Sequence, residues 1–297
     1  MQQEEPAVDF RPPDRFRRGQ VEAGGLRLNY WRRGRGRPLL VLHGVTDWGL
    51  DWARFARRVE DQLDCVLLDQ RGHGYSDKPE RGYSYADFAQ DAWQVIEQLG
   101  LRRPAVLGHS MGGGVALALA AEHGPHLDRL LLVDPAIRLV VPDDQRAATA
   151  DRQARPRPTP DERRASLTAR QALGRRVLLE QLRAEQPDWD DEDVRHTVES
   201  TLLVNAAVWQ GTERWFDPEA QEQQLHRLAC PTLIVRGEPA LGAIVSDAAV
   251  ARIEEVAPPG LLRVTTIPGT GHLPQRQAFE RFVDEVLPFL TEEQPLR

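Results

Sequence analysis

The feature that most constrains the fold is an alternation of short apolar runs with longer segments of helical periodicity. Continuous apolar runs of this kind are typical of strands buried on both faces of a sheet. They lie at 38–42, 64–68, 104–107, 130–133, 232–235 and 261–267, and 26–31 alternates like a half-exposed strand. Helical spacing of apolar residues is found at 52–63, 85–98, 111–123 and 279–290. This alternation predicts an α/β protein with a mostly parallel, doubly wound sheet.

One long segment, 138–226, interrupts this rhythm because it contains no strand-like run. Its patterns are helical, over 159–185, 190–209 and 217–227. A helical insertion between two strands predicts a cap, or lid, on a core formed by 19–137 and 227–297. Residues 1–18 are rich in proline, arginine and aspartate, and we expect them to form a loose tail.

The composition excludes several classes of protein. The 297 residues carry 38 Lys and Arg against 45 Asp and Glu, and this net charge of −7 is unsuited to general binding of nucleic acid or anionic membranes. No apolar run approaches the ~20 residues of a membrane span, and the polar first residues do not resemble a secretory signal. Two cysteines, Cys65 and Cys230, are too few for a disulfide scaffold or a cysteine-based zinc site. We therefore expect a cytoplasmic protein with two reduced core thiols.

A glycine–x–serine–x–glycine motif is the strongest chemical signal in the chain. The sequence GHSMG at 108–112 follows the predicted strand 104–107 and opens the predicted helix 111–123. This is the context of a nucleophile elbow, where a tight strand-to-helix turn exposes the serine hydroxyl at the carboxyl end of the sheet. The helix N-terminus behind the serine favours developing negative charge. We predict that Ser110 is a nucleophile; a phosphate-binding loop fits poorly because no Gly-Lys-Ser/Thr follows.

Together with three further motifs, this elbow resembles the α/β-hydrolase superfamily. The motif LHG ends at Gly44 after one predicted strand, and DQRGHGYSDKP begins at Asp69 after the next. Gly271 and His272 follow the last predicted strand. The resemblance covers nearly the whole chain outside the tail and the cap. It implies the α/β-hydrolase fold, a mostly parallel central sheet flanked by helices, with an inserted helical cap.

The resemblance also implies an acyl-transfer site around Ser110. His272, in IPGTGHLP, is expected to be the base that takes the serine proton. The backbone N–H groups of Val45 and Met111 are expected to bind the oxyanion. Gly44 is expected to border the substrate and to allow the tight turn that aims Val45. The resemblance implies no metal and no organic cofactor.

Two carboxylates compete for the role of the acid that orients the base. Many members of the family place an aspartate at a position that is Ala240 here. Asp134, at the end of a predicted strand, resembles the acid position of haloalkane dehalogenases and zearalenone-type lactonases. Glu238 lies close to the usual place, and Asp247 is a more distant third candidate. We favour Asp134 because the usual place lacks an aspartate.

A serine at the elbow indicates acyl-enzyme chemistry on a carbonyl compound. We predict a hydrolase of a small, apolar or aromatic carboxylic ester or lactone, either a carboxylesterase or a lactonase. Trp209 is expected to line the substrate pocket because it ends an apolar helical stripe. The alternatives are a carbon–carbon bond hydrolase, a perhydrolase or haloperoxidase on the same triad, and a slow-turnover ligand receptor. The expected partner is a small molecule, not nucleic acid or membrane, and a homodimer stays an open alternative.

Overall fold

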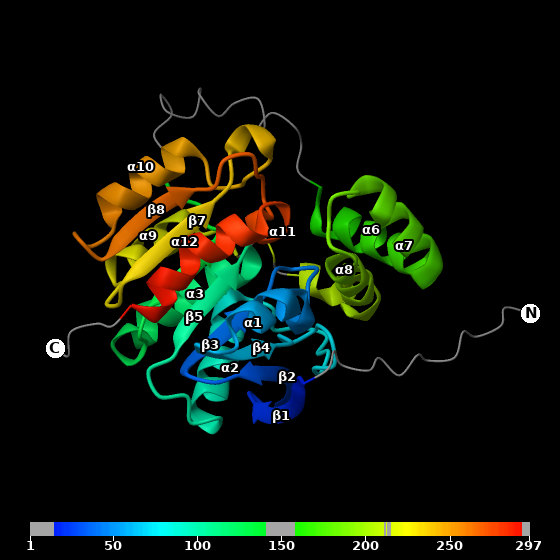
Figure 1. Ribbon diagram of the computed structural model, residues 1–297, viewed down its shortest axis with the longest axis horizontal. Helices are drawn as coiled ribbons and strands as arrows, with labels where there is room; N and C mark the ends of the chain where they lie inside the picture. Colours follow the sequence, from blue (N-terminus) through cyan, green and yellow to red (C-terminus); the bar gives the residue numbers. More distant parts are fainter. Residues whose placement is uncertain (1–14, 141–157, 211, 213–214, 293–297) are drawn as a thin grey trace, which may run out of the picture.

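A single eight-stranded sheet forms the centre of the computed structural model, which describes residues 15–140, 158–210, 212 and 215–292 (Figure 1). The strand order is β1-β2-β4-β3-β5-β6-β7-β8. The strands are β1 (Arg17–Ala23), β2 (Leu26–Gly34), β3 (Arg37–Leu42), β4 (Leu63–Leu68), β5 (Ala105–His109), β6 (Leu130–Val133), β7 (Thr232–Arg236) and β8 (Leu262–Thr266). Strand β2 pairs antiparallel with β1 and β4, and the pairings from β4 through β8 are parallel.

Helices cover both faces of this sheet. They are η1 (Gly49–Trp52), α1 (Ala53–Val59), α2 (Tyr85–Gln98), α3 (Met111–His123), η2 (Gly124–His126), α9 (Pro218–His226), η6 (Pro239–Leu241), α10 (Asp247–Val256), α11 (Pro274–Gln277) and α12 (Phe279–Thr291). One apolar core joins the sheet to α2, α3 and α10, and the other joins it to α1 and α12. Strands β5, β6 and β7 are buried at every residue, which explains their continuous apolar sequences. The predicted fold is confirmed.

A helical insertion lies between β6 and β7 and stands beside the sheet in Figure 1. We use "the insertion" for α6 (Pro160–Ala172), α7 (Gly174–Glu185), α8 (Asp191–Leu203) and η4 (Ala206–Trp209). Helices α7 and α8 share a small apolar cluster formed by Leu178, Leu182, Val194 and Val198. Helix α9 packs against α3 and α10 of the core, although the sequence placed it in the cap.

Several predicted boundaries are wrong. The helix expected over 159–185 is two helices, because the chain turns at Gly174, whose φ is +73°. The helix expected over 190–209 ends at Leu203, and Asn205 caps a separate 3₁₀ turn by accepting from Ala207 N. The expected tail is shorter, because Arg17 already belongs to β1; residues 1–14 of that tail lie outside the described part.

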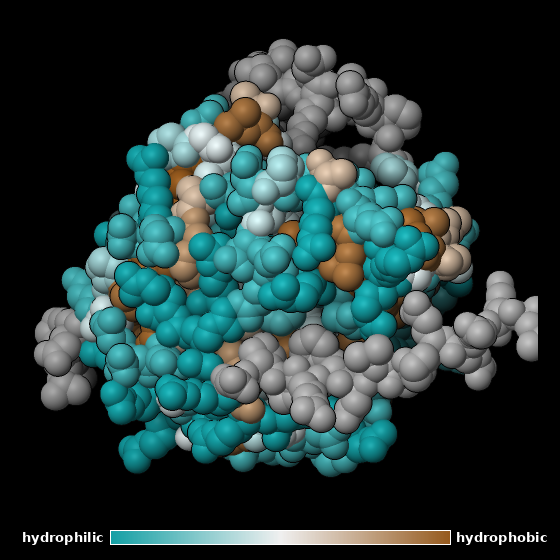
Figure 2. Space-filling model, turned by 45° about the vertical axis from the view of Figure 1, so that its right-hand side comes forward, coloured by the Kyte–Doolittle hydropathy of each residue, from teal (hydrophilic) through white to brown (hydrophobic). Residues whose placement is uncertain are grey.

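Among the residues that the structure describes, few large apolar side chains are exposed. Those exposed are Val140, Leu173, Leu241 and Ile244. On the face shown in Figure 2, the uncovered surface is mostly hydrophilic and apolar residues form small areas. Cys65 and Cys230 are buried free thiols. Within the described ranges, none of the helices has the length and apolarity needed to cross a bilayer.

Candidate active site

Ser110 occupies a strained turn between β5 and α3. Its backbone has φ 52° and ψ −115°, a conformation that costs free energy in a non-glycine residue and is typical of functional turns. The turn needs glycine around it, because a Cβ at Gly108 would lie 2.2 Å from the Gly112 oxygen, and one at Gly112 would lie 2.1 Å from the Leu42 oxygen. Ser110 N donates to Val133 O at 3.0 Å, which fixes the turn to β6.

The His272 ring lies between the serine and an aspartate. Its Nε2 is 3.0 Å from Ser110 Oγ, and its Nδ1 is 2.6 Å from Asp134 Oδ2. In the tautomer that donates from Nδ1 to the carboxylate, Nε2 is free to accept the serine proton. The His272 side chain is 33% exposed, so the chain of hydrogen bonds is open to solvent at the histidine.

Asp134 follows β6 directly and is fully buried. Besides His272, its carboxylate accepts hydrogen bonds from Ile244 N at 2.8 Å and Val245 N at 3.1 Å. These donors fix the orientation of the carboxylate and compensate for its burial. The other two carboxylates considered in the sequence have different partners. Glu238 accepts from Gly269 N, and Asp247 pairs with Arg236.

The turn after β3, residues 43–47, is fixed by Gln70, by His73 and by its own Asp47. We call it the oxyanion loop because it contains Val45, which the sequence predicts to bind an oxyanion. Gln70 donates from its side chain to His43 O at 2.9 Å and from its backbone to His43 Nε2 at 3.1 Å. His73 Nε2 lies 2.9 Å from Val45 O. Asp47 Oδ2 accepts from Gly44 N at 3.1 Å. The loop therefore has a fixed position beside the elbow.

The oxyanion loop packs directly against the first turn of α3, which begins at Met111. The Cα of Gly112 approaches the backbone of Leu42 and His43 so closely that no side chain would fit between them. This approach brings Gly44 and Val45 to the same end of the sheet as Met111. Burial lowers the pKa of His43 to about 3 and also lowers that of His73, so both rings are neutral at pH 7.

Trp209 belongs to an aromatic cluster that is linked to the elbow through Trp215, Tyr85 and Ala136. Its ring centroid is 6.5 Å from that of Trp215, and Trp215 stacks on Tyr85 at 5.4 Å. The Tyr85 hydroxyl donates to Ala136 O, and Ala136 N donates to Ser110 O. Sequence reasoning did not find Tyr85, because an aromatic residue in a helical pattern carries no signal for a site.

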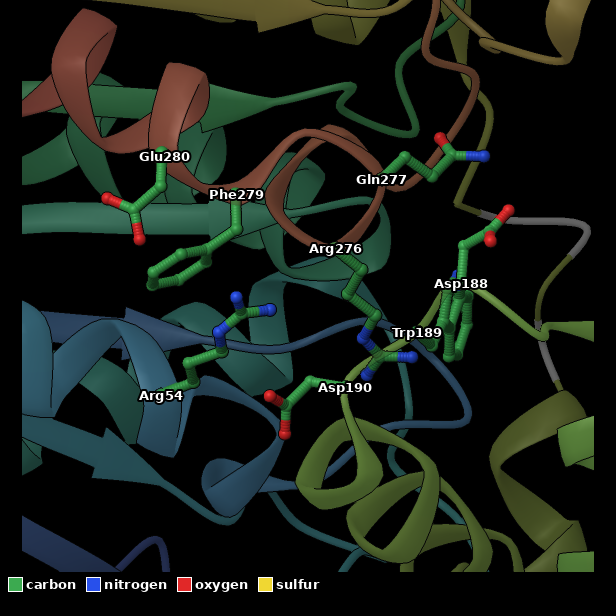
Figure 3. A pocket seen from close by; sticks show the side chains of 8 residues that line it. All are labelled: Arg54, Asp188, Trp189, Asp190, Arg276, Gln277, Phe279 and Glu280. Atoms are coloured by element: carbon green, nitrogen blue, oxygen red, sulfur yellow. The ribbon is translucent and has the colours of Figure 1, made fainter.

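A cavity of about 330 Å³ lies beside α11 (Figure 3). It is lined by Arg54, Asp188, Trp189, Asp190, Arg276, Gln277, Phe279 and Glu280. Ser110, Asp134 and His272 are not among these lining residues. The cavity therefore does not contain the hydrogen-bonded chain of Ser110, His272 and Asp134.

One relative of known sequence matches nearly the whole chain, and another matches less than half of it. The 2-(acetamidomethylene)succinate hydrolase of Mesorhizobium japonicum is 29% identical over 296 residues, which cover 94% of this chain and 93% of that protein. The N-formylmaleamate deformylase of Pseudomonas putida is 38% identical over 121 residues, covering 40% of this chain and 45% of that protein.

Solved structures have the same fold. The crystal structure of E-2-(acetamidomethylene)succinate hydrolase superposes with a TM-score of 0.73 at 24% identity, covering 93% of this chain and all of that one. An esterase from Exiguobacterium antarcticum gives 0.71 at 21% identity, with coverages of 92% and 99%. The model of the family described as "alpha/beta hydrolase fold" matches residues 37–278. The resemblance predicted from the four motifs is confirmed: the chain belongs to the α/β-hydrolase family and is a hydrolase of that fold.

Proposed function

We propose that the chain is a serine hydrolase that cleaves a small carboxylic ester or lactone through an acyl-enzyme on Ser110. The observation that carries this proposal is the continuous hydrogen-bonded chain from Ser110 Oγ through His272 to Asp134. A nucleophile, a base within reach of its proton and an acid that orients the base form the minimal set for this chemistry. We propose that the insertion acts as a cap that encloses the substrate.

The reaction has two stages. His272 Nε2 takes the Ser110 proton while Oγ attacks the carbonyl carbon, and the N–H groups of Val45 and Met111 bind the resulting oxyanion. Asp134 stabilises the protonated His272, which then gives its proton to the leaving alkoxide. In the second stage His272 takes a proton from water, hydroxide attacks the acyl carbon, and Ser110 Oγ leaves with the proton that His272 returns.

Amide hydrolysis is the second candidate. The relative that matches along nearly the whole chain is named for a substrate with an acetamido group. The same three residues serve both reactions, since an amide differs in the leaving nitrogen that His272 must protonate. The same three residues would also serve a perhydrolase or haloperoxidase, a carbon–carbon bond hydrolase or a slow-turnover receptor. These alternatives are separated by measuring the turnover of defined substrates.

The test compares the wild type with Ser110→Ala on p-nitrophenyl esters of increasing acyl length, on an aromatic macrolactone and on 2-(acetamidomethylene)succinate. We expect ester or lactone turnover that falls by at least about 10⁴-fold in Ser110→Ala. Mass spectrometry of a rapidly quenched reaction should show the acyl group on Ser110 in the wild type. Unchanged turnover in Ser110→Ala would refute the mechanism, and turnover of the amide alone would replace the ester by the second candidate.

A further inference from the structure

A buried group of charged side chains lies beside the proposed catalytic residues. We call it the charged cluster: Asp47 from the oxyanion loop, Asp51 from η1, Asp193 from α8 and Arg276 from α11. The exposed fraction of each side chain is 11% or less. Burial of charge costs free energy, and removal of one partner of a buried pair is strongly destabilising. An arrangement of this cost needs a physical explanation.

Arg276 joins three separate parts of the chain. Its Nη2 lies 2.8 Å from Asp51 Oδ1 and 3.8 Å from Asp47 Oδ1. Its Nη1 donates to the hydroxyl of Thr197, on α8, at 2.9 Å. Figure 3 shows the side chain reaching from α11 toward Trp189, which lies just before α8; the guanidinium carbon is 4.8 Å from the centre of that ring. One cation therefore connects the oxyanion loop, the short helix after it and the insertion.

Asp47 faces the catalytic groups on its other side. Its Oδ2 accepts from Gly44 N, the residue before Val45, and lies 3.3 Å from His109 Nδ1. The opposite ring nitrogen of His109 lies 3.1 Å from the backbone oxygen of His272. Burial opposes ionisation of Asp47, but His109 and Arg276 more than offset it, so the pKa of Asp47 lies below its ordinary value. Asp47 is thus a carboxylate shared between the oxyanion loop and His109, whose ring in turn contacts the backbone of His272.

The contacts of the charged cluster place it between the insertion and the two loops that the proposed reaction depends on. Asp47 fixes Gly44, and Arg276 lies four residues after His272 in the chain. Asp51 also accepts from Trp48 N at 3.0 Å, which secures the segment that follows the oxyanion loop. A movement of α8 would shift Thr197, and through Arg276 it would act on Asp47.

We propose that Asp47 and Arg276 are positioning residues, which hold the oxyanion loop in register with His272 and with helix α8 of the insertion. This inference rests on the proposed function. Neither residue belongs to the proposed reacting groups, so both act through Gly44, Val45 and His272. Their loss should weaken binding of the oxyanion and leave binding of the ground-state substrate nearly unchanged.

The alternative is that the charged cluster only anchors the insertion to the core. The chain offers a matched control for this alternative, because Arg54 of α1 pairs with Asp193 of α8 at 3.3 Å. This second pair also joins the core to the insertion, whereas Arg276 is the cation that lies beside Asp47 of the oxyanion loop. An anchoring role predicts similar effects of Arg54→Met and Arg276→Met, whereas a positioning role predicts a larger effect of Arg276→Met on catalysis.

The experiment measures kcat and KM with a p-nitrophenyl ester, together with inhibition by two compounds. An alkylboronic acid forms a tetrahedral adduct on the serine and places an oxygen where the oxyanion binds, whereas butyrate probes ground-state binding. The variants are Asp47→Ala, Asp47→Asn, Arg276→Lys, Arg276→Met and Arg54→Met. Thermal unfolding establishes which variants are folded, and Asp47→Asn and Arg276→Lys are the conservative ones if the others unfold.

We expect Asp47→Ala to lower kcat by about 10- to 100-fold, less than the loss of an entire oxyanion donor, with KM nearly unchanged. Boronic acid inhibition should weaken by the same factor while butyrate inhibition stays constant. Asp47→Asn should recover part of kcat, because its amide oxygen still accepts from Gly44 N. The kcat of Arg276→Lys should lie between the kcat of the wild type and that of Arg276→Met.

Two results would overturn the inference. One is a parallel change in boronic acid and butyrate inhibition, which would indicate general damage to the site. The other is an equal loss of kcat in Arg54→Met and Arg276→Met. Failure of the proposed function is distinct from both, because the wild type itself would then show no turnover that depends on Ser110.

Discussion

Acidification from pH 7 to pH 5 should destabilise this chain through His196. This histidine lies on α8 and is 4% exposed. Its ring packs edge-to-face against that of Trp48, with 6.1 Å between the ring centroids. Burial lowers the pKa of His196 to about 4, although the Glu192 carboxylate and a hydrogen bond from His196 to the Leu50 backbone both act to raise it. A neutral imidazole therefore fills the contact between the insertion and the segment after the oxyanion loop.

The sign and size of the effect follow from proton linkage. An unfolded histidine has a pKa of about 6.5, so below that pH the unfolded chain binds a proton that the folded chain excludes until about pH 4. The free energy of unfolding therefore falls as the pH falls through this window. For one histidine with these two pKa values, the loss between pH 7 and pH 5 is about 2 kcal/mol.

The assay is urea unfolding followed by tryptophan fluorescence, at pH 7 and at pH 5, for the wild type and His196→Gln. Glutamine retains a donor for the Leu50 backbone but does not titrate. The difference in unfolding free energy between the two pH values should be smaller by about 2 kcal/mol in His196→Gln. His226→Gln, at the exposed end of α9, should retain the wild-type difference. Equal pH differences in the wild type and His196→Gln would refute the reasoning.

Three further results are expected. Asp134→Asn should lower kcat by about 10⁴-fold, because an amide favours the wrong tautomer of His272, whereas Glu238→Gln should leave kcat nearly unchanged; steady-state ester hydrolysis compares them. Gly112→Ala should lower the free energy of unfolding by roughly 1–3 kcal/mol, because its Cβ would meet the Leu42 carbonyl, and thermal or denaturant unfolding measures this loss. A chelator should leave hydrolysis unchanged, because the proposed reaction uses only Ser110, His272 and Asp134; ester hydrolysis with and without EDTA checks this.

Local motifs predicted the centre of the candidate site because the topology of a parallel sheet determines where each loop lies. Strands β3, β5 and β6 run in the same direction, so Val45, Ser110 and Asp134 must emerge at one edge. The spacing of Gly108 and Gly112 around the serine indicated the strained turn. Asp134 and Glu238 lie 138 and 34 positions before His272 in the sequence (272 − 134 and 272 − 238). A local sequence pattern does not show which of the two carboxylates contacts the histidine.

The parts that sequence patterns missed depend on long-range contacts or on weak periodicity. Strand β1 contains few apolar residues and most of its residues are exposed, so its sequence does not predict a strand. Only its pairing with β2 identifies it as one. The charged cluster joins Asp47, Asp193 and Arg276, which are far apart in the sequence. Each of these residues taken alone looks like an ordinary surface charge, because charged side chains are seldom buried without partners.

With the proposed acid, Asp134, directly after β6, the segment after β7 has a different role. In many members of the family this segment carries the acid, but here position 240 is alanine. The same segment instead supplies two amide donors to Asp134, from Ile244 and Val245, and Arg236 holds its Val245 oxygen at 2.9 Å. Glu238 stabilises the loop before His272 through Gly269 N. The segment after β7 therefore still sets the orientation of His272, but it does so through the buried carboxylate of Asp134 and the backbone before the histidine.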